Sequence, residues 1–345
     1  MKKSKLFAFI LCVSLATMAR ANSILLPLYH YVYTPLPTIY GYVDVEPVAI
    51  NNQNQVVGTA YVPGPGLPEA FMSSGGQIKL YPSPGGYSDS FGLGINSAGV
   101  IVGIGTVPTG MHAIYANPGS AAIDINNNPQ QDSSARALTD NGYFVGQVNN
   151  QPAFGSTTGH WISSVASLLG ADFYMTGINN DLTAIGFGSA GGAIWEVSTN
   201  AVTQLSTVLG TTANKPTAIN QNGAVAGTVG TTGFIYENGT VTYFGTNIAS
   251  VNGINSSNHI VGSLTNGHGY LYSASTHTLT DVNTLVPSSV SSEWTIKSAT
   301  GINDHNSICG LAVRADGSSG YQGYTLVISS YLSVRLATPE VYVKN

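Results

Sequence analysis

The sequence predicts an all-β chain folded as a seven-bladed β-propeller, with four short antiparallel strands in each blade. Three observations favour this fold class. One ten-residue pattern recurs seven times, and a second, looser hairpin pattern lies between successive copies. Apolar residues alternate with polar ones and show no helical spacing over long runs. The copies lie roughly 40 residues apart, which is the length of a four-stranded propeller blade. We therefore expect one blade from each repeat.

The first hairpin of each repeat is clearest in the sequence AINQNGAVAG, at residues 218–227. Each copy starts with Ala or Gly and ends with Gly, which leaves room where backbones crowd together. The second position is occupied by Ile50, Ile95, Leu138, Ile178, Ile219, Ile254 and Ile302. Asn follows in six copies and Thr139 in the third, as suits the start of a type I turn. Three residues after it, Gly or Asn stands in six copies and Leu182 in the fourth, which indicates a left-handed backbone. We interpret this hairpin as the inner strand pair of a blade.

The second hairpin of the repeat is clearest in GFIYENGTVTYFG from Gly233, where the pair Asn238-Gly239 is a strong hairpin signal. Equivalent segments begin at Ala70, His112, Ala193 and Gly269. Aromatic side chains recur along these segments, and we assign them to the third strand of successive blades, where packing between blades is favoured over a row for stacking sugars. These aromatic residues are Tyr115, Trp161, Trp195, Tyr236 and Tyr272.

The ends of the chain give the remaining domain organisation. Residues 1–21 have the basic, apolar and small-residue layout of a cleavable secretory signal peptide, and the apolar run is too short for a permanent anchor. Residues 22–47 form an N-terminal extension, 48–336 the seven-repeat propeller and 337–345 a C-terminal tail. Two segments could complete the last blade, one near residues 28–33 and the other at residues 332–336. We favour closure by the N-terminal segment, because an open ring would expose strand edges.

The composition restricts the possible partners. Charged residues make up 8% of the chain, the net charge is −5 and no basic cluster lies beyond the first five residues, which argues against nucleic acid as a partner. Cys12 lies in the signal segment, so Cys309 is the one cysteine of the mature chain and is predicted to be a small core residue. We expect a secreted monomer without a transmembrane anchor, whether its final address is the periplasm, the cell surface or the medium.

The repeat resembles the HAF-repeat family of bacterial extracellular proteins, which is named for a His-Ala-Phe triplet. The resemblance covers roughly residues 48–328 and rests on the repeated hairpin pattern, on His112-Ala113-Ile114 and on His268-Gly269-Tyr270. The order of residues 281–285, 294–296 and 299–304 is similar to the family's last repeat. The triplet departs from the pattern at residues 69–71, 159–161 and 233–235. The resemblance implies secretion and a repeat fold, and it assigns no chemistry to particular residues, including His112 and His268.

Few residues stand out as candidates for chemistry. Asp140, Asp181 and Asp304 lie in the repeated turn, where Asp is a common structural residue. His259, His268 and His277 lie nine residues apart, a spacing that matches no known metal-ligand pattern. The sequence contains neither the GxSxG pattern of a nucleophile elbow nor a phosphate-binding GxxxxGK[ST] loop. We therefore predict no cofactor or metal site, and catalytic residues remain unassigned.

Two hypotheses for the function follow. The chain could be a non-enzymatic binding module that holds an extracellular protein or a glycan through loops at one face of the ring. The alternative is a secreted glycan hydrolase or lyase with acids that converge on the axis. Two carboxylates about 5 to 10 Å apart at the axis would favour the enzyme, and their absence would favour binding.

Overall fold

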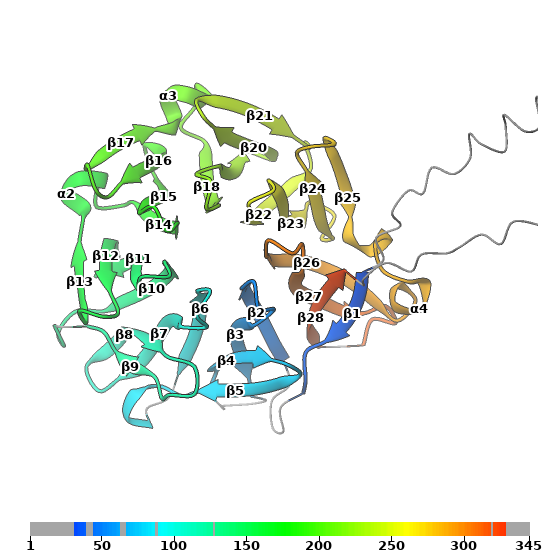
Figure 1. The fold of residues 1–345 in the computed structure, drawn as a ribbon, viewed down its shortest axis with the longest axis horizontal. Helices are drawn as coiled ribbons and strands as arrows, with labels where there is room; N and C mark the ends of the chain where they lie inside the picture. Colours follow the sequence, from blue (N-terminus) through cyan, green and yellow to red (C-terminus); the bar gives the residue numbers. More distant parts are fainter. Residues whose placement is uncertain are drawn as a thin grey trace, which may run out of the picture. The chain divides into compact units, whose positions relative to one another are not determined.

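The computed structural model describes residues 31–38, 44–62, 67–86, 89–126, 128–318 and 320–328. Residues 31–328 form one compact unit. Its strands make seven four-stranded antiparallel sheets arranged as a ring around a central axis (Figure 1). The predicted seven-bladed β-propeller is therefore confirmed. The predicted signal peptide, the segment 332–336 and the C-terminal tail lie outside the described residues.

The strands follow one another blade by blade. Blade 1 contains β2 (Asp44–Ile50), β3 (Val56–Tyr61), β4 (Glu69–Ser74) and β5 (Gln77–Tyr81). Blade 2 contains β6 (Ser90–Ile95), β7 (Ile101–Val107), β8 (Gly110–Ala116) and β9 (Ile123–Asp124). Blade 3 contains β10 (Ser133–Leu138), β11 (Tyr143–Val148), β12 (Gln151–Ser156) and β13 (Trp161–Ser164). Blade 4 contains β14 (Tyr174–Ile178), β15 (Thr183–Gly188), β16 (Gly191–Glu196) and β17 (Ala201–Gln204).

Blade 5 contains β18 (Asn214–Ile219), β19 (Val225–Val229), β20 (Thr232–Glu237) and β21 (Thr240–Phe244). Blade 6 contains β22 (Ile248–Ile254), β23 (His259–Leu264), β24 (Gly269–Ser273) and β25 (Thr278–Asp281). Blade 7 contains β26 (Trp294–Ile302), β27 (Ile308–Arg314), β28 (Tyr321–Ile328) and, from the other end of the chain, β1 (Tyr31–Pro35). The first strand of each repeat lies nearest the axis, as predicted (Figure 1).

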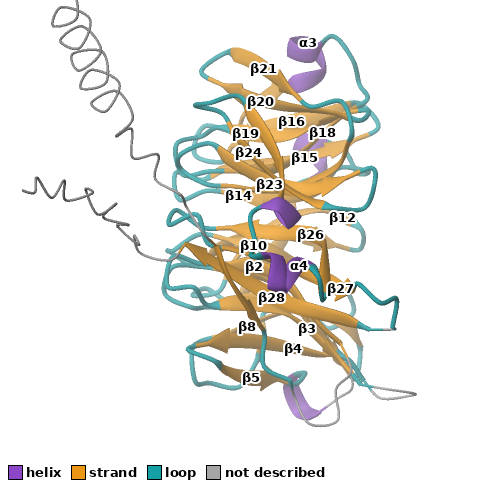
Figure 2. Cartoon of the chain, turned by 90° about the vertical axis from the view of Figure 1, so that its right-hand side faces the viewer, coloured by secondary structure: helices purple, strands orange, loops and turns teal. Residues whose placement is uncertain are grey.

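Short helices occur on the connections that lead from the fourth strand of one blade to the first strand of the next (Figure 2). The α-helical turns are α2 (Ala166–Leu169), α3 (Leu205–Leu209) and α4 (Ser288–Ser291). The two 3₁₀ turns are η1 (Pro84–Gly86) and η2 (Val282–Thr284). The sequence patterns did not predict these helices, because single turns are too short to show helical periodicity. None of the described helices has the length and apolar character needed to cross a membrane.

The repeated turn has the predicted backbone conformation in all seven blades. The residue expected to be left-handed has a positive φ in each copy, including Leu182 at 60° and Gly223 at 82°. In blade 1, the amide of Asn54 donates to the carbonyl of Asn51, and the amide of Asn51 donates to the carbonyl of Gln55. This is a type I turn followed by a left-handed residue. Asn238 and Gly239 also both have positive φ, as a type I′ hairpin requires.

Every inner strand carries a β-bulge two residues before the Ile/Leu position. The bulge brings its backbone close to the closing glycine of the partner strand. A Cβ atom on Gly58 would overlap the carbonyl of Glu46, and the other six closing glycines face equivalent carbonyls. This close approach is the reason for the invariant glycine in the pattern. The bulge also turns one additional residue of each inner strand toward the axis.

The N-terminal strand β1 closes the ring. It pairs antiparallel with β28, with Tyr31 opposite Ile328 and Pro35 opposite Tyr324. The preferred closing segment is thus confirmed where it overlaps the described residues, from Tyr31 onward. Tyr33 packs against Tyr324 and Trp294 of the same blade, with ring centroids 5.7 and 6.3 Å apart. Blade 7 is therefore built from both ends of the chain.

The hydrophobic core lies between the blades. One cluster joins Ala226, Ile235 and Phe244 of blade 5 to Ile260 and Tyr270 of blade 6, and all five side chains are buried. Phe244 and Tyr272 stack with ring centroids 4.3 Å apart. Seven such clusters are found among the described residues, and each contains residues of two neighbouring blades. Burial of apolar area between blades is the main force that holds a propeller together.

Cys309 is fully buried in the cluster between blades 7 and 1, as predicted for a small core residue. Burial raises the pKa of its thiol to about 12. A thiol that stays protonated is a poor nucleophile and a poor metal ligand. The structure therefore gives Cys309 a packing role.

The strand assignment in blade 3 was wrong. The third strand is β12 at Gln151–Ser156, and Trp161 begins the fourth strand, so residues 159–161 do not occupy the position of the His-Ala-Phe triplet. Ala153 pairs with the closing glycine Gly146 and occupies the last place of the triplet. The hairpin before it turns at Asn149 and Asn150, which both have positive φ. Two adjacent asparagines were the sequence signal for this turn.

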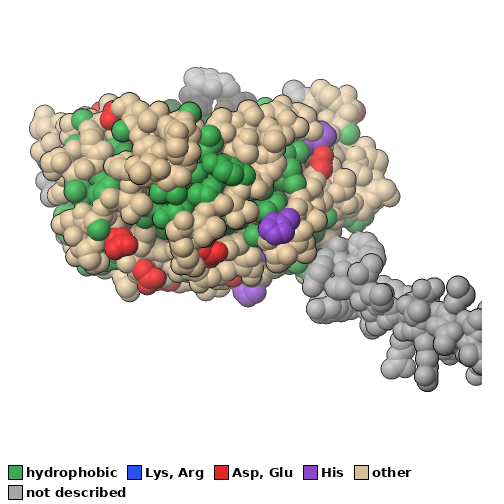
Figure 3. All heavy atoms as spheres, turned by 90° about the horizontal axis from the view of Figure 1, so that it is seen from above, with side chains coloured by type: hydrophobic (Ala, Val, Ile, Leu, Met, Phe, Trp, Pro, Cys, Tyr) green, Lys and Arg blue, Asp and Glu red, His purple; other side chains and the backbone are tan. Residues whose placement is uncertain are grey.

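The surface is polar but carries few charges. On the side drawn in Figure 3, backbone and side chains that are neither hydrophobic nor charged cover most of the molecule, with hydrophobic areas and a few acids and histidines among them. Within the described part of the chain, Arg314 and Glu293 form the one ion pair between an arginine or lysine and an acid, at 3.8 Å. Such an exposed pair contributes little to stability. Packing and hydrogen bonds thus hold the ring together.

Candidate functional site: the axial cavity

A cavity of about 640 Å³ runs along the axis of the ring and is lined by the inner strands of all seven blades. Its volume is in the range of pockets that bind small molecules. A second cavity of about 190 Å³ continues it at the end where the repeated turns lie. The Ile/Leu positions of most repeats line both cavities, so the two spaces follow one another along the axis.

The residues at the bulges give the larger cavity its chemical character. They belong to equivalent positions, two residues before the Ile/Leu of each repeat, and all of them line the cavity. These residues are Val48, Leu93, Arg136, Thr176, Thr217, Asn252 and Thr300. The rest of the lining consists mostly of small and branched apolar side chains, with Tyr174 and Phe187 from blade 4. No acidic residue lines this cavity within the described part of the chain.

Most polar side chains at the bulges are already engaged in hydrogen bonds. The hydroxyl of Thr176 donates to the carbonyl of Pro216, and that of Thr217 donates to the carbonyl of Val251. The Asn252 amide donates to the carbonyl of Ala299 at 2.9 Å. Each of these bonds joins one inner strand to the next. These side chains therefore brace the ring and offer few free donors to a molecule in the cavity.

Arg136 differs from the other bulge residues. Its guanidinium lies over the ring of Tyr174, with Cζ 4.5 Å from the ring centroid. Its Nε is buried and has no hydrogen-bond partner among the described residues, and no carboxylate there pairs with the guanidinium. Stacking on an aromatic face stabilises the positive charge but uses none of the five N–H donors of the guanidinium. Arg136 is thus a cation with free donors in a largely apolar cavity.

Next to Arg136, the two aromatic residues of blade 4 form one wall of the cavity. Tyr174 lies beside Phe187, with ring centroids 6.0 Å apart, and Lys215 of blade 5 lies over Phe187 at 5.6 Å. Lys215 is exposed and does not line the cavity. Glu46 occupies the same register position in blade 1 as Tyr174 and Lys215 do in blades 4 and 5, and it also does not line the cavity.

A ring of hydrogen bonds surrounds the smaller cavity. The side-chain amide of the turn asparagine in each blade donates to the backbone carbonyl of the equivalent residue in the next blade. Asn220 donates to Asn255 at 2.9 Å, Asn255 to Asn303 at 3.0 Å, and Asn303 to Asn51 at 2.9 Å across the closure of the ring. Three further links have the same geometry, and Thr139, which has no amide, leaves the seventh link open. We call this set the asparagine ring.

Each member of the asparagine ring also holds its own turn together. The carbonyl oxygen of the Asn303 side chain accepts from the amides of His305 and Ser307, at 3.0 and 2.9 Å. Thr139 fulfils the same role through its hydroxyl, which accepts from the Tyr143 amide at 3.1 Å. The asparagines are less than 10% exposed. The sequence pattern indicated the turn, but it gave no sign that the amide reaches the next blade.

The two acids near the axis are part of this bracing. Asp140 accepts from the amide and hydroxyl of Ser97 and from the Asn180 side chain. Asp304 accepts from the Ser256 amide at 2.8 Å and from the Asn52 side chain at 3.0 Å. Burial alone would raise the pKa of both carboxyls, but these hydrogen bonds outweigh it and lower both pKa values below the ordinary value.

This result bears on the hypothesis of a glycan hydrolase. A general acid in glycoside hydrolysis needs a raised pKa, and neither Asp140 nor Asp304 has one. Both carboxylates bridge neighbouring blades, and all three acids of the repeated turn are exposed. Burial raises the pKa of Glu46, but this residue lines neither cavity. No acid that lines the two cavities within the described part of the chain therefore has the raised pKa of a general acid.

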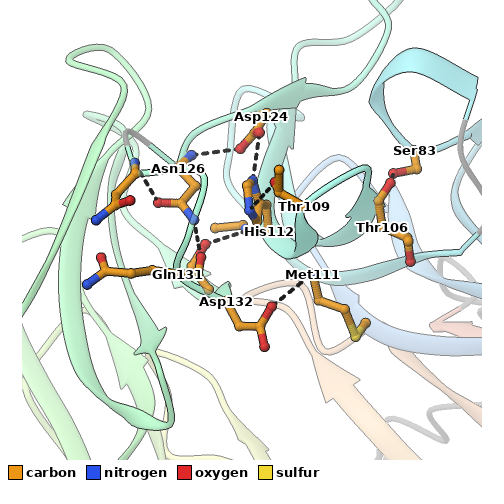
Figure 4. Close-up of polar contacts among 12 residues, drawn as sticks. Ser83, Thr106, Thr109, Met111, His112, Asp124, Asn126, Gln131 and Asp132 are labelled. Carbon is orange, nitrogen blue, oxygen red and sulfur yellow. Dashed lines mark hydrogen bonds and ion pairs between the residues drawn. The ribbon is translucent and has the colours of Figure 1, made fainter.

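His112 and His268 occupy equivalent positions in blades 2 and 6, and each contacts an aspartate of its own blade. The Nδ1 of His112 lies 2.8 Å from Asp124, and that of His268 lies 2.7 Å from Asp281. In each blade this contact joins the start of the third strand to the end of the fourth. Figure 4 shows His112 between Asp124 and Thr109, beneath the loop that carries Asn126. His112 is 1% exposed, so its imidazole acts inside the blade.

The other histidines considered for metal binding are not brought together. His259 contacts the Asn306 side chain at 2.8 Å, and His277 contacts the Tyr272 hydroxyl at 3.3 Å, whereas His268 pairs with Asp281. Among the residues that the structure describes, no three His, Cys, Asp or Glu side chains are grouped as a metal site.

Sequence analysis missed Arg136, although a signal was present. When the seven repeats are aligned on the Ile/Leu position, Arg136 is the one charged residue at the position two places earlier. The ten-residue pattern begins at the small residue just before the Ile/Leu and does not include this position. A single cation at a position that otherwise holds Val, Leu, Thr or Asn indicated that blade 3 differs from the others in charge.

No family model and no curated protein sequence matches the chain. The resemblance to the HAF-repeat family therefore remains a prediction. Solved structures do match. The chain is similar to a streptogramin B lyase, with a TM-score of 0.57 and 11% identity over 87% of this chain and 98% of that chain. It is also similar to YCF48 bound to a D1 peptide, with a TM-score of 0.54 and 13% identity over 88% of this chain and 96% of that one.

A third similar structure is the extracellular domain of a hybrid two component system from B. thetaiotaomicron. Its TM-score is 0.54 at 10% identity, over 88% of this chain and 40% of that chain. At such identities the similarity establishes the propeller fold alone. The three proteins are described as a lyase, a peptide complex and an extracellular domain, so the fold does not separate an enzyme from a binding module. The choice between an enzyme and a binding module therefore depends on the residues that line the axial cavity.

Proposed function

We propose that this chain is a secreted, non-enzymatic binding module that takes its ligand into the axial cavity through one face of the ring. The observation that carries the proposal is the cavity of about 640 Å³, which all seven blades line without contributing an acid among the described residues. A site that binds needs volume, apolar walls and a few free polar groups. A site that hydrolyses glycans needs a pair of carboxylates with different pKa values.

The surroundings of the cavity support a rigid site. The asparagine ring and the bonds from Thr176, Thr217 and Asn252 tie inner strands to their neighbours at two levels of the axis. A preorganised cavity loses little entropy when a ligand binds. The secreted location rests on the basic and apolar start of the chain, and recovery of a mature N-terminus near Asn22 from an exported fraction would test it.

A blocking variant tests the cavity. Leu93 lines it and has no polar role, so Leu93→Trp adds bulk to the cavity without removing a hydrogen bond. Val32→Trp adds the same bulk on strand β1, where the side chain is 49% exposed, and serves as the matched control. We expect ligand-detected NMR with a mixture of organic acids, neutral aromatics and oligosaccharides to give hits that Leu93→Trp loses and Val32→Trp keeps.

The same experiment separates binding from catalysis. Each hit is incubated with the protein and then recovered for mass spectrometry, and we expect it to be chemically unchanged. Hits that Leu93→Trp retains in full would place the binding site outside the cavity. A hit that is cleaved or rearranged would support the enzyme alternative. Either result would overturn the proposal.

A further inference from the structure

The cavity contains one feature that selects among ligands. Of the side chains that line it, Arg136 alone combines a positive charge with free donors, and its Nε is buried without a partner among the described residues. Buried polar groups without partners are rare in folded proteins and call for an explanation. The residue as a whole is half-buried and lines the cavity, so an anion there could accept from the guanidinium donors that reach the open space, since an arginine fork matches a carboxylate or sulfonate.

From this we infer that the ligand is a small organic anion with an aromatic or apolar body, held by Arg136 in the axial cavity. The inference rests on the proposed function and adds the chemical class of the ligand. Tyr174 keeps the guanidinium in place from one side, at 4.5 Å, which limits the rotamers that Arg136 must give up on binding. The anionic group then accepts from N–H donors in the plane of the guanidinium, which stacking on Tyr174 does not use.

The rest of the cavity explains why the body of the ligand is apolar. The hydroxyls of Thr176 and Thr217 and the amide of Asn252 already donate to backbone carbonyls of the next blade. A sugar, which carries several hydroxyls, would lose its hydrogen bonds to water and find few free partners there. An aromatic ring instead would pack against Phe187 and the aliphatic side chains of the inner strands.

Electrostatics favours an anion in the same place. No acid lines this cavity within the described residues, and the two ionised acids Asp140 and Asp304 line the neighbouring small cavity instead. Lys215 lies near the wall over Phe187 and adds a second positive charge nearby. The mostly apolar walls of the cavity have a low dielectric constant, which strengthens the attraction between Arg136 and an incoming anion.

A pair of dyes that share one aromatic body tests the inference. Anilinonaphthalene sulfonate carries an anionic group, whereas N-phenylnaphthylamine has the same rings without the charge. Both become fluorescent in apolar sites, so their affinities can be measured by titration. We expect Arg136→Met to weaken the sulfonate by about tenfold to a hundredfold and to leave the neutral dye within about twofold, because charged hydrogen bonds are lost and the cavity remains apolar.

Two further variants complete the design. Arg136→Lys keeps the charge but loses the fork, and we expect an intermediate affinity for the sulfonate. Arg314→Met is the matched control, because Arg314 also lies over an aromatic ring, that of Trp294 at 4.3 Å, but outside the cavity. It should leave both dyes unaffected. Unchanged binding of the neutral dye to Arg136→Met also shows that this variant is folded.

The outcomes distinguish the two proposals. If Leu93→Trp abolishes binding of both dyes but Arg136→Met weakens them equally or not at all, the inference about the anion is wrong and the binding cavity stands. If Leu93→Trp changes neither dye, the cavity is not a binding site and the proposed function fails together with the inference.

Discussion

The asparagine ring allows a quantitative test at the point where the propeller closes. Asn303 is 4% exposed, and its side chain makes four hydrogen bonds. Its amide donates to the Asn51 carbonyl and to the Asn54 side chain of the first blade, at 2.9 and 2.8 Å. Its side-chain oxygen accepts from His305 and Ser307 within the turn. Replacement by alanine removes all four bonds and leaves the buried Ser307 amide unpaired, whereas the Asn51 carbonyl keeps the Asn54 amide as a donor.

The size of the effect follows from the number of groups left unpaired. A hydrogen bond contributes about 1 kcal/mol, and a buried unsatisfied group costs about 1 to 3 kcal/mol. We therefore expect Asn303→Ala to lower the free energy of unfolding by about 3 to 5 kcal/mol. For a domain of this size, that corresponds to a melting temperature lower by roughly 5 to 8 °C.

A second substitution separates the two roles of the side chain. Asn303→Thr places in blade 7 what blade 3 already has at Thr139, a hydroxyl that accepts from the turn but cannot reach the next blade. It should cost about 1 to 3 kcal/mol, less than alanine. The reverse change, Thr139→Asn, supplies the missing seventh link to the Asn179 carbonyl and should stabilise the protein by about 1 kcal/mol.

Urea unfolding followed by tryptophan fluorescence would measure these differences, with thermal unfolding as a second probe. The expected order of stability is Thr139→Asn, wild type, Asn303→Thr and then Asn303→Ala. An Asn303→Ala protein as stable as the wild type would refute the reasoning. It would mean that the ring of hydrogen bonds is replaced by water without loss.

Three more predictions concern other parts of the fold. Gly223→Val should cost about 1 to 2 kcal/mol from backbone strain alone, because φ is 82° and a Cβ atom there meets no atom within 4 Å; an unchanged urea midpoint would contradict the left-handed turn. Deletion of residues 22–35 removes strand β1, exposes the edge of β28 and should give an insoluble or strongly destabilised protein, whereas a soluble protein with the original melting curve would show that β1 is dispensable. Because hydrogen bonds lower the pKa of Asp304 below the ordinary 3.8, its carboxylate stabilises the fold fully above that value, and this contribution is lost as the pH falls through the lowered pKa. The difference in urea midpoint between about pH 6 and about pH 3 should therefore be smaller in Asp304→Ala than in the wild type, and equal differences would contradict it.

The sequence alone determined the number of blades and the form of their inner hairpins. These features depend on local conformational preferences, and the residues that carry them recur in each repeat. Gly or Asn at the left-handed position and Asn at the start of the turn bias a few neighbouring dihedral angles, whatever the rest of the chain does. Even Leu182, which departs from the pattern, has φ of 60°, because hydrogen bonds from Leu182 and Thr183 to Asn179 fix the turn. The closing glycines were predictable for the same reason, although the bulge that requires them was not.

Tertiary structure decided everything that depends on a partner far along the chain. Tyr31 finds Ile328 because β28 would otherwise leave an unpaired edge, and no local signal selects that strand over another. The Asn303 amide reaches Asn51 because the ring closes, and it would face water in an isolated repeat. Arg136 becomes a candidate ligand site because seven inner strands surround it without placing an acid at its side within the described chain. Local preferences fix a turn within a few residues, whereas hydrogen-bond partners, burial and the field around a charge are fixed only when distant strands are brought together.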